Sequence, residues 1–423
     1  MTPPFVRAQA KDESQKQDAR SVESAAVVAY KNHDYETFLR DMQFLVRLRP
    51  HHPGLIFNLA AAYCLTGEKD QAIDLLSEIA RMGVVEPIAD AKQFASLIPD
   101  QRFQEIVHRI DSNGMPVSNS EVAFRLQEKG LVPEGVAFDP NTGSFFLGSV
   151  YRRKIVRIDR YGRASDFATS EDGLWSAMGM KIDAKRRRLW VATTAQAQMM
   201  GANEAINGSA GILEFDLKTG RRVAFYTLPN SPDHHILGDL LLDSNGNVYA
   251  TDSLTPAIYV IRKGSDRIEK FLEYPDWVSP QGLSFSADGK TLFMADYARG
   301  LYSVRMDTKE VTWWDSTDDI TLLGIDGLYL YKNALIGVQN GVNPARVVRL
   351  TLDSSHSLVT RSTVLEANNP LFDEPSLGVI VGHQFFFIAN SQWGMVNSNG
   401  QLAPLDKLKE PVILKVHMSR KNG

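Results

Sequence analysis

The sequence predicts a multidomain α plus all-β protein, in which a helical N-terminal part precedes a six-bladed β-propeller. Apolar residues spaced as on one face of a helix continue to about Asp111. Beyond that point a strand–turn–strand pattern recurs in six copies at a period of about 45 residues. Short strands repeated at this period are typical of propeller blades, which bring the same position of every blade to one central axis.

The helical part is expected to cover residues 21–111, after a polar segment, residues 1–20, that we expect to be disordered. Its clearest repeat spans residues 53–84, where the small residue Ala60 allows two helices to approach closely and Gly67 forms the turn between them. This pattern resembles a tetratricopeptide repeat. A weaker copy precedes it and a third helical piece follows, so the array is short. We expect it to dock on the propeller or to bind a short segment of a protein partner.

Residues 112–120 form the expected linker, the propeller is expected to cover residues 121–418, and residues 419–423 form a tail. The last blade is one strand short, and an alternating apolar–polar segment, residues 122–126, precedes the first blade. We therefore predict that strand 122–126 completes the last blade and closes the ring, which removes exposed sheet edges. The first strand of each blade is marked by a glycine or its equivalent: Gly135, Gly179, Asp239, Gly282, Gly327 and Gly378.

The composition excludes some classes of function. A formal net charge of −4 over 423 residues gives no basic surface for nucleic acid, so no nucleic-acid partner is expected. No stretch approaches the roughly 18–20 apolar residues of a membrane span, so no span is predicted. The single cysteine, Cys64, lies in an apolar helical segment and cannot form an intrachain disulfide, which leaves the compartment undetermined.

The N-terminus bears on localisation. Ala8-Gln9-Ala10 resembles the small-x-small end of a signal peptide, although residues 1–10 lack an apolar core. A chain that begins near a cleavage site and an ordinary polar N-terminus both fit this pattern. A periplasmic or secreted location is slightly favoured over a cytoplasmic one.

One position per blade is expected to face the propeller axis. Neighbouring strands are antiparallel, so the start of each first strand and the end of each second strand lie on the same face of the disk. The residue before the glycine position is polar in blades one, four and five, where it is Glu134, Gln281 and Asp326. Two carboxylates in a low-dielectric funnel would repel each other unless a cation or a proton lay between them. Oxygen donors without cysteine or paired histidine suit a hard cation such as Ca²⁺.

A second set of polar residues ends the second strands and is expected to shape a pocket for a small-molecule substrate. In blade three a carboxylate also lies one residue further into the first strand. The alternative is that such residues only cap turns, as Asp and Asn commonly do. The expected substrate-binding residues are Asp239, Asp252, Asp296, Asn340 and Asn390.

Three motifs give residues 121–418 a family resemblance: Pro-Glu-Gly at 133–135, Ala-Asp-Gly-Lys-Thr-Leu-Phe at 287–293, and Ile-Asp-Gly-Leu at 325–328. The region resembles the regucalcin, gluconolactonase and paraoxonase-like group of calcium-dependent six-bladed propellers, with strictosidine synthase as a more distant relative. The resemblance implies a site for Ca²⁺ or another divalent cation. The ligands that it implies are Glu134, Gln281 and Asp326.

Two positions depart from the family pattern. Gln281 stands where the family has a shorter asparagine, and it would have to fold back to reach a cation. Blade three has Gly238-Asp239 in place of an Asn-Asp pair, so an amide that orients the substrate is missing. These departures leave a weakened or altered metal site open.

A general base is expected near the axis. His234 and His235 precede the first strand of blade three on the funnel face, and histidine is the commonest general base. The alternative for this pair is a surface loop beside Pro232. The insertion over residues 194–209 is a candidate lid. Three tryptophans, Trp175, Trp277 and Trp393, either wall an apolar pocket or pack between blades.

These features lead to the hypothesis of a metal-dependent, calcium-using hydrolase that acts on a lactone or related ester in the central funnel. The cation would polarise the carbonyl group, and Asp326 or His235 would activate water. The alternative hypothesis is a non-catalytic propeller that binds a ligand or a protein, with the helical domain as a protein-interaction domain. Fold resemblance alone is a weak basis for choosing between them, because propellers host many activities.

Overall fold

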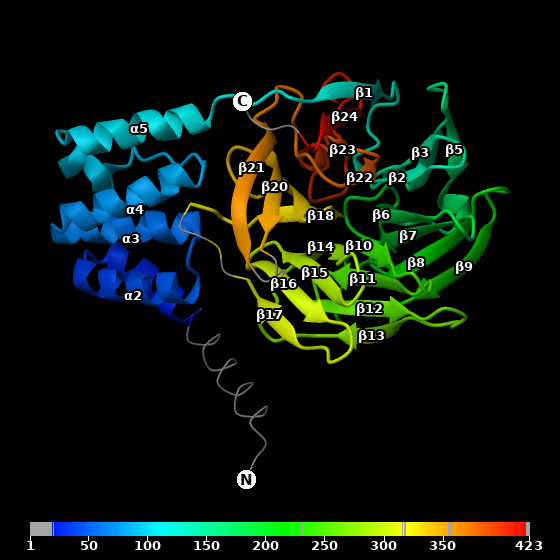
Figure 1. Ribbon diagram of the computed structural model, residues 1–423, viewed down its shortest axis with the longest axis horizontal. Coiled ribbons are helices and arrows are strands. Elements are labelled where there is room, and N and C mark those ends of the chain that lie inside the picture. The colour runs from blue at the N-terminus through cyan, green and yellow to red at the C-terminus, as the bar shows by residue number, and fades with distance from the viewer. Residues whose placement is uncertain are drawn as a thin grey trace, which may run out of the picture.

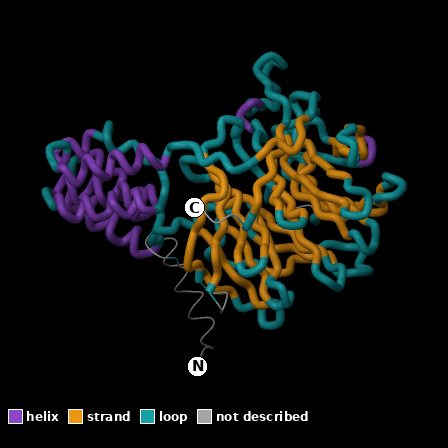
Figure 2. Tube along the Cα trace, turned by 45° about the horizontal axis from the view of Figure 1, so that its top comes forward, coloured by secondary structure: helices purple, strands orange, loops and turns teal. Residues whose placement is uncertain are grey.

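The computed structural model describes residues 19, 21–229, 232–314, 316, 319–353 and 358–419. A helical domain lies beside the propeller, next to the edge formed by β20 (Arg346–Leu352) and β21 (Val359–Ala367), as Figures 1 and 2 show. The expected disorder of residues 1–20 lies outside the described residues, except at Ala19, which is helical and buried. Among the described helices, none is long and apolar enough to cross a bilayer.

The helical domain is built from short helices with recognisable ends. Asp34 caps α2 by accepting a hydrogen bond from Thr37 N at 3.1 Å. Gly67 ends α3 at a φ of 94°, a left-handed conformation that glycine adopts without strain. Ala60 and Ala72 are fully buried where α3 and α4 meet, as their small size predicts. After a helix over residues 21–31, the elements are α2 (Tyr35–Leu48), α3 (Pro53–Thr66), α4 (Lys69–Arg81), the 3-10 helix η1 (Lys92–Leu97) and α5 (Gln101–Asn113).

The propeller consists of six four-stranded antiparallel sheets, one for each blade. Blade one contains β2 (Pro133–Asp139), β3 (Ser144–Ser149), β4 (Lys154–Ile158) and β5 (Ala164–Ala168), and η2 (Ser170–Asp172) follows it. Blade two contains β6 (Ser176–Asp183), β7 (Arg188–Thr194), β8 (Ala210–Asp216) and β9 (Arg222–Thr227). Blade three contains β10 (Leu237–Leu242), β11 (Val248–Asp252), β12 (Ala257–Ile261) and β13 (Glu269–Leu272).

Blades four to six complete the ring. Blade four contains β14 (Pro280–Phe285), β15 (Thr291–Asp296), β16 (Gly300–Arg305) and β17 (Val311–Trp313). Blade five contains β18 (Ile325–Tyr331), β19 (Ala334–Gln339), β20 and β21. Blade six contains β22 (Gly378–Val381), β23 (Gln384–Ile388), β24 (Val412–His417) and β1 (Glu121–Arg125), with η3 (Trp393–Met395) between β23 and β24.

Strand β1 closes the ring, which confirms the prediction. It pairs antiparallel with β24 at the outer edge of blade six, with Glu121 opposite Lys415 and Arg125 opposite Val412. The first and last strands of the propeller are therefore held in one sheet. The apolar core lies between blades, and one buried cluster joins the facing sheets of blades two and three.

Three glycines of the repeat, Gly135, Gly179 and Gly282, lie where adjacent first strands meet. The β-ladder is irregular near the equivalent position of five blades, for example between Pro133 and Val136 in β2. A Cβ on Gly282 would come within 2.6 Å of the carbonyl oxygen of Asp326 in the next blade, so the two backbones approach as closely as only glycine allows. Irregularities of this kind re-aim side chains, and the residue before the glycine is the one expected at the axis.

Hydrogen bonds tie the helical domain to the propeller. Arg346 Nη1 donates to the carbonyl oxygens of Met82 and Gly83, each at 3.0 Å. The backbone amide of Val85 donates to the carbonyl oxygen of Asn343 at 2.6 Å. The helical domain is therefore bonded directly to blade five, in addition to the covalent connection through residues 114–120.

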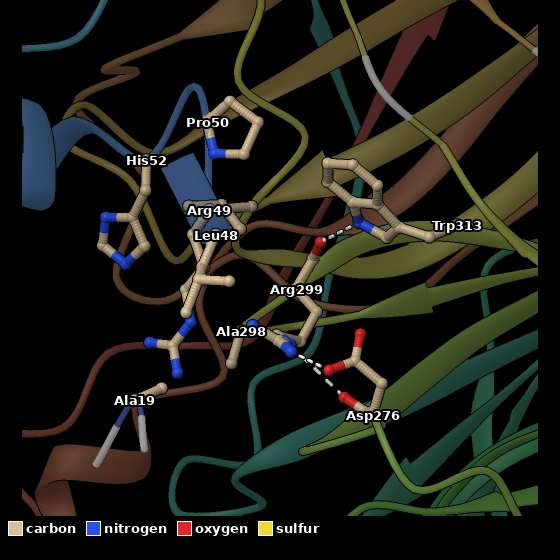
Figure 3. Close-up of a pocket in the computed structure, with 10 residues that line it drawn as sticks. Ala19, Leu48, Arg49, Pro50, His52, Asp276, Ala298, Arg299 and Trp313 are labelled. Atoms are coloured by element: carbon tan, nitrogen blue, oxygen red, sulfur yellow. Dashed lines mark hydrogen bonds and ion pairs between the residues drawn. The ribbon is translucent and has the colours of Figure 1, made fainter. Parts of the chain in front are cut away.

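A cavity of about 160 Å³ lies at the boundary between the domains. Arg49 and His52 of the helical domain contribute to its lining, together with Arg299 and Trp313 of the propeller (Figure 3). Arg299 forms an ion pair with Asp276. Burial, followed by the charge of Arg49, lowers the pKa of His52, so its ring is neutral at pH 7.

Candidate functional site

A second cavity, of about 350 Å³, lies where the first strands of the blades converge. Four of the predicted site residues line it: Glu134, Gln281, Asp326 and Asn340. The other five predicted residues are not among its lining residues: His235, Asp239, Asp252, Asp296 and Asn390. The structure thus brings together the three expected ligands and one expected substrate-binding residue.

Glu134 is held by one of its two carboxylate oxygens. Its Oε2 accepts hydrogen bonds from Trp393 Nε1 at 2.8 Å and from Ser391 Oγ at 3.3 Å, which leaves Oε1 for a ligand. Burial and the charge of Asp326 raise the pKa of Glu134 well above its usual value, and outweigh the opposing effect of the two hydrogen bonds. The site therefore disfavours an ionised Glu134 unless positive charge accompanies it.

Asp326 is held in the same manner. Its Oδ2 accepts a hydrogen bond from Asn340 Nδ2 at 3.1 Å, which leaves Oδ1 for a ligand. Asn340 is fixed in turn, because the Tyr297 hydroxyl donates to its Oδ1 at 2.9 Å and its Nδ2 donates to the carbonyl oxygen of Pro375 at 2.9 Å. Burial and the charge of Asp239 raise the pKa of Asp326 to about 7.

Gln281 and Gly238, the two departures from the family pattern, are neighbours in space. Gln281 Nε2 donates to Ser279 Oγ at 3.2 Å, which leaves the amide oxygen Oε1 as an acceptor. That oxygen lies 3.0 Å from the point where Gly238 would carry a Cβ. The longer amide of blade four therefore takes up space that a side chain at position 238 would need.

Asp239, which is buried, forms an ion pair with the half-buried Lys181 close to the two carboxylates. Its Oδ1 lies 3.0 Å from Lys181 Nζ, whereas its Oδ2 is buried without a hydrogen-bond partner among the described residues. The Tyr329 ring centre lies 5.4 Å from Lys181 Nζ, and burial and the charges of Asp239, Asp326 and Glu134 raise the pKa of Tyr329. An orphaned carboxylate oxygen in such a cluster is a group that a cation or an ordered water satisfies.

His235 and Asp252 form a buried pair beside the cavity. His235 Nδ1 lies 2.6 Å from Asp252 Oδ2, and Asp252 Oδ1 accepts the backbone amide of Ile236 at 3.1 Å. The cavity reaches the next residues, Ile236 and Ser253, but His235 and Asp252 themselves are not among its lining residues. The histidine is therefore positioned by a carboxylate, one residue away from the lining.

Asp296 and Asn390 hold backbone segments at equivalent strand ends. Asp296 Oδ2 accepts the backbone amides of Val278 at 2.7 Å and Ser279 at 2.9 Å. Asn390 Oδ1 accepts the amide of Val412 at 2.7 Å. Asp296 also caps its own turn, because its Oδ1 accepts the backbone amide of Ala298 at 3.0 Å. Both side chains therefore hold backbone segments together.

The rim of the cavity contains residues that the sequence pattern did not single out. Gln196 and Gln198 line it from the insertion over residues 194–209, the candidate lid. Tyr297 lines the cavity, and Ser391 lies behind it and donates to Glu134. Each directly follows a predicted strand-end residue, so extending the strand-end position by one residue would have found both. Trp393, by contrast, was one of three tryptophans considered as a pocket wall, and it lines the cavity and donates to Glu134, whereas Trp175 and Trp277 are not among the lining residues.

The donor set around the cavity fits a hard cation. Glu134 Oε1, Asp326 Oδ1 and Gln281 Oε1 are oxygen donors on three different blades. In the described part of the chain, no group of three or more His, Cys, Asp or Glu side chains is arranged to hold a metal ion. A cation here would therefore depend on an amide oxygen beside two carboxylates, and would keep positions open for water or substrate.

No protein-family model matches the chain, and no curated protein matches it. Among solved structures, it is similar to a gluconolactonase from Xanthomonas campestris, with 12% identity and a TM-score of 0.47 over 72% of this chain and 98% of that one. It is also similar to the calcium-binding protein regucalcin from Agrobacterium tumefaciens, with 16% identity and a TM-score of 0.49 over 70% and 93%. A third is virginiamycin B lyase from Staphylococcus aureus, with 17% identity and a TM-score of 0.46 over 70% and 88%. Identities this low concern the fold alone.

Proposed function

We propose that the protein is a metal-dependent hydrolase, using Ca²⁺ or another divalent cation, that acts on a lactone or related ester in the central funnel. One observation carries the proposal. Glu134, which is buried, and Asp326, which is half-buried, come from different blades, have raised pKa values, and each leave one carboxylate oxygen to the same cavity. Burying ionised carboxylates costs several kcal/mol per ion unless positive charge compensates, so a purely structural role would be costly.

The cation would be held by Glu134, Asp326 and Gln281. When bound, it would polarise the carbonyl group of the ester and stabilise the negative charge that develops on its oxygen. Asp239 and Lys181 lie beside these ligands as an ion pair, so this part of the cluster is already neutralised. The remaining excess negative charge lies on Glu134 and Asp326, which is what a divalent cation balances.

Asp326 is the residue best placed to accept a proton from the attacking water. It lines the cavity, and with a cation bound beside it the carboxylate would be ionised and able to accept a proton. Attack forms a bond between the water oxygen and the carbonyl carbon, the ring or ester C–O bond breaks, and the departing alkoxide takes up the proton from Asp326. His235, the other predicted base, is not among the lining residues.

The lining favours a small, uncharged substrate. Gln196, Gln198 and Gln281 offer amide hydrogen bonds, and Trp393 and Met178 offer apolar surface. Among the described lining residues there is no Lys or Arg to pair with a phosphate or carboxylate group. A volume of about 350 Å³ is at the small end of ligand pockets.

The proposal is tested by calcium-dependent thermal stabilisation and by turnover of a panel of lactones and aryl esters. Wild type is compared with Asp326→Ala and with Asp288→Ala, which alters an exposed hairpin turn. We expect Ca²⁺ to stabilise wild type and Asp288→Ala, and Asp326→Ala to lose the stabilisation and at least about 100-fold of the turnover. Stabilisation without Asp326-dependent turnover would support the alternative of a non-catalytic binding propeller. Absence of both would overturn the proposal.

A further inference from the structure

The loop between β19 and β20, residues 340–345, touches both the funnel and the helical domain. At its start, Asn340 lines the funnel cavity and donates to Asp326. Three residues later, the carbonyl oxygen of Asn343 accepts the backbone amide of Val85 from the helical domain at 2.6 Å. One short segment therefore connects the docking surface with the hydrogen bond that orients Asp326.

The funnel end of this loop is tightly packed. The amide of Gly341 donates to the carbonyl oxygen of Gly324 at 3.0 Å, and the amide of Gly324 donates to that of Tyr297 at 2.8 Å. A Cβ on Gly341 would lie 2.7 Å from the Tyr297 hydroxyl, the same hydroxyl that donates to Asn340. Movement of residue 341 would therefore be transmitted to both Tyr297 and the segment that leads into Asp326.

The helical end of the loop is anchored by Arg346, which is 3% exposed. Its Nη1 donates to the carbonyl oxygens of Met82 and Gly83, and its Nε donates to Gln339 Oε1 at 2.6 Å. All of these acceptors are uncharged. Burial lowers the pKa of Arg346 to about 10, so the guanidinium group remains charged at neutral pH. The helical domain holds this buried guanidinium group in place, because two of its three hydrogen-bond acceptors belong to that domain.

Gln339 connects this anchor to the strand that carries Asp326. It lies opposite Arg346 in the β19–β20 ladder. Its Nε2 donates to the carbonyl oxygens of Thr321 at 3.0 Å and Leu323 at 2.6 Å, in the segment just before β18. Asp326 follows three residues after Leu323. Gln339 is thus held by Arg346, which the helical domain anchors. Gln339 in turn holds the segment that leads into Asp326.

We propose that Arg346 and Gln339 are positioning residues through which docking of the helical domain holds Asp326 and Asn340 in their funnel geometry. The helical domain is then part of the site's support rather than a separate module. By reciprocity, a ligand or cation that orders the funnel would also strengthen the contact between the domains. The link between the docked helical domain and Asp326 does not depend on the proposed function. Its effect on cation binding rests on that function.

The experiment uses full-length protein and separates the two halves of the link. Arg346→Met removes the contact with the helical domain. Gln339→Glu keeps an acceptor for Arg346 but cannot donate to the carbonyl oxygens of residues 321 and 323. Asn368→Ala is the matched control, because Asn368 Nδ2 bonds the propeller to the residue that ends α5, at the carbonyl oxygen of Gly114, without touching Gln339.

Two readouts are needed. Hydrogen exchange in metal-free protein reports on the amides of Gly324 and Gly341, and isothermal titration reports on the Kd for Ca²⁺. We expect both Arg346→Met and Gln339→Glu to lose protection at these two amides by about tenfold. We also expect the Ca²⁺ Kd to rise about tenfold in both, whereas Asn368→Ala changes neither by more than about twofold.

The outcomes distinguish this inference from the proposed function. Unchanged exchange at both amides in Gln339→Glu would overturn the inference, even if Arg346→Met fails to fold. An equal loss in Asn368→Ala would also overturn it, because docking in general rather than this link would then be responsible. If wild type binds no Ca²⁺, the proposed function fails, and the exchange measurement still decides the inference.

Discussion

Gln281 Oε1 lies 3.0 Å from the position that a Cβ on Gly238 would occupy, so the amide of blade four fills the place of a missing side chain in blade three. Each residue departs from the family pattern when it is considered alone. In space they complement each other, because glycine makes room for the longer side chain. The pair therefore provides one amide oxygen, that of Gln281, at the cavity that Asp326 also lines. The family pattern implies two separate amides, one in each of the two blades.

The first prediction tests this complementarity by a double-mutant cycle. Gly238→Asn alone is expected to weaken Ca²⁺ binding by about tenfold, because the new side chain displaces the Gln281 amide. In a Gln281→Asn background the same substitution is expected to cost far less, since the shorter side chain vacates the contested space. Isothermal titration of the four proteins gives the interaction free energy. Simple additivity would show that the two departures are unrelated.

The second prediction concerns the cost of the buried carboxylates. The pKa of Asp326 is raised from its ordinary value of 3.8 to about 7 in the folded protein, so between these values the native state binds more protons than the unfolded state. The stability of metal-free protein should therefore fall as the pH rises from about 4 to about 7. Asp326→Asn removes this penalty, and is expected to be more stable than wild type by on the order of 2 kcal/mol at pH 8.

Urea unfolding of metal-free wild type and Asp326→Asn at pH 4.5 and pH 8 checks this expectation. The difference between the two proteins should be small at the lower pH and large at the higher pH. Glu134→Gln should act in the same direction, because burial and the Asp326 charge raise the pKa of Glu134 as well. An Asp326→Asn protein that is less stable than wild type at pH 8 would contradict a raised pKa.

The fold could be predicted because glycines of the repeat mark positions where the backbones of neighbouring blades are in close contact. Gly135, Gly179 and Gly282 each stand where two first strands approach too closely for a Cβ, so the spacing of these glycines predicts the blade register. With the register known, Glu134 and Asp326 fell at equivalent positions of different blades, and both line the cavity. Closure by β1 followed from the same register, because one blade lacked a strand.

Side-chain direction could not be predicted in the same way. Asp296 and Asn340 both end or follow second strands, yet Asp296 turns back to the amides of Val278 and Ser279 while Asn340 faces Asp326. The difference depends on the path of the preceding loop, which the repeat does not specify. The partners of Asp239 and Arg346 could not be predicted either, because each residue pairs with residues that are distant in the sequence. Lys181, for example, is 58 positions away from Asp239.

The third prediction is the pH dependence of cation binding. Binding requires Glu134 and Asp326 to be ionised, and both have raised pKa values in the metal-free protein. Ca²⁺ affinity should therefore increase as the pH rises through about 7, with release of protons on binding. Titrations in two buffers of different ionisation enthalpy measure the proton release directly. An affinity that stays constant between pH 6 and pH 8 would mean that these carboxylates are not the ligands.

The fourth prediction separates a catalytic from a structural His235. In the structure its Nδ1 lies 2.6 Å from Asp252 Oδ2, a contact that an asparagine amide can reproduce and an alanine cannot. If the role is structural, His235→Asn should keep kcat within about threefold of wild type, while His235→Ala should lose about 1–3 kcal/mol of stability by leaving Asp252 buried without this partner. Thermal unfolding and turnover of the best ester substrate are measured on both variants. A loss of about 100-fold in kcat in both, with His235→Asn still fully stable, would instead identify His235 as the general base in place of Asp326.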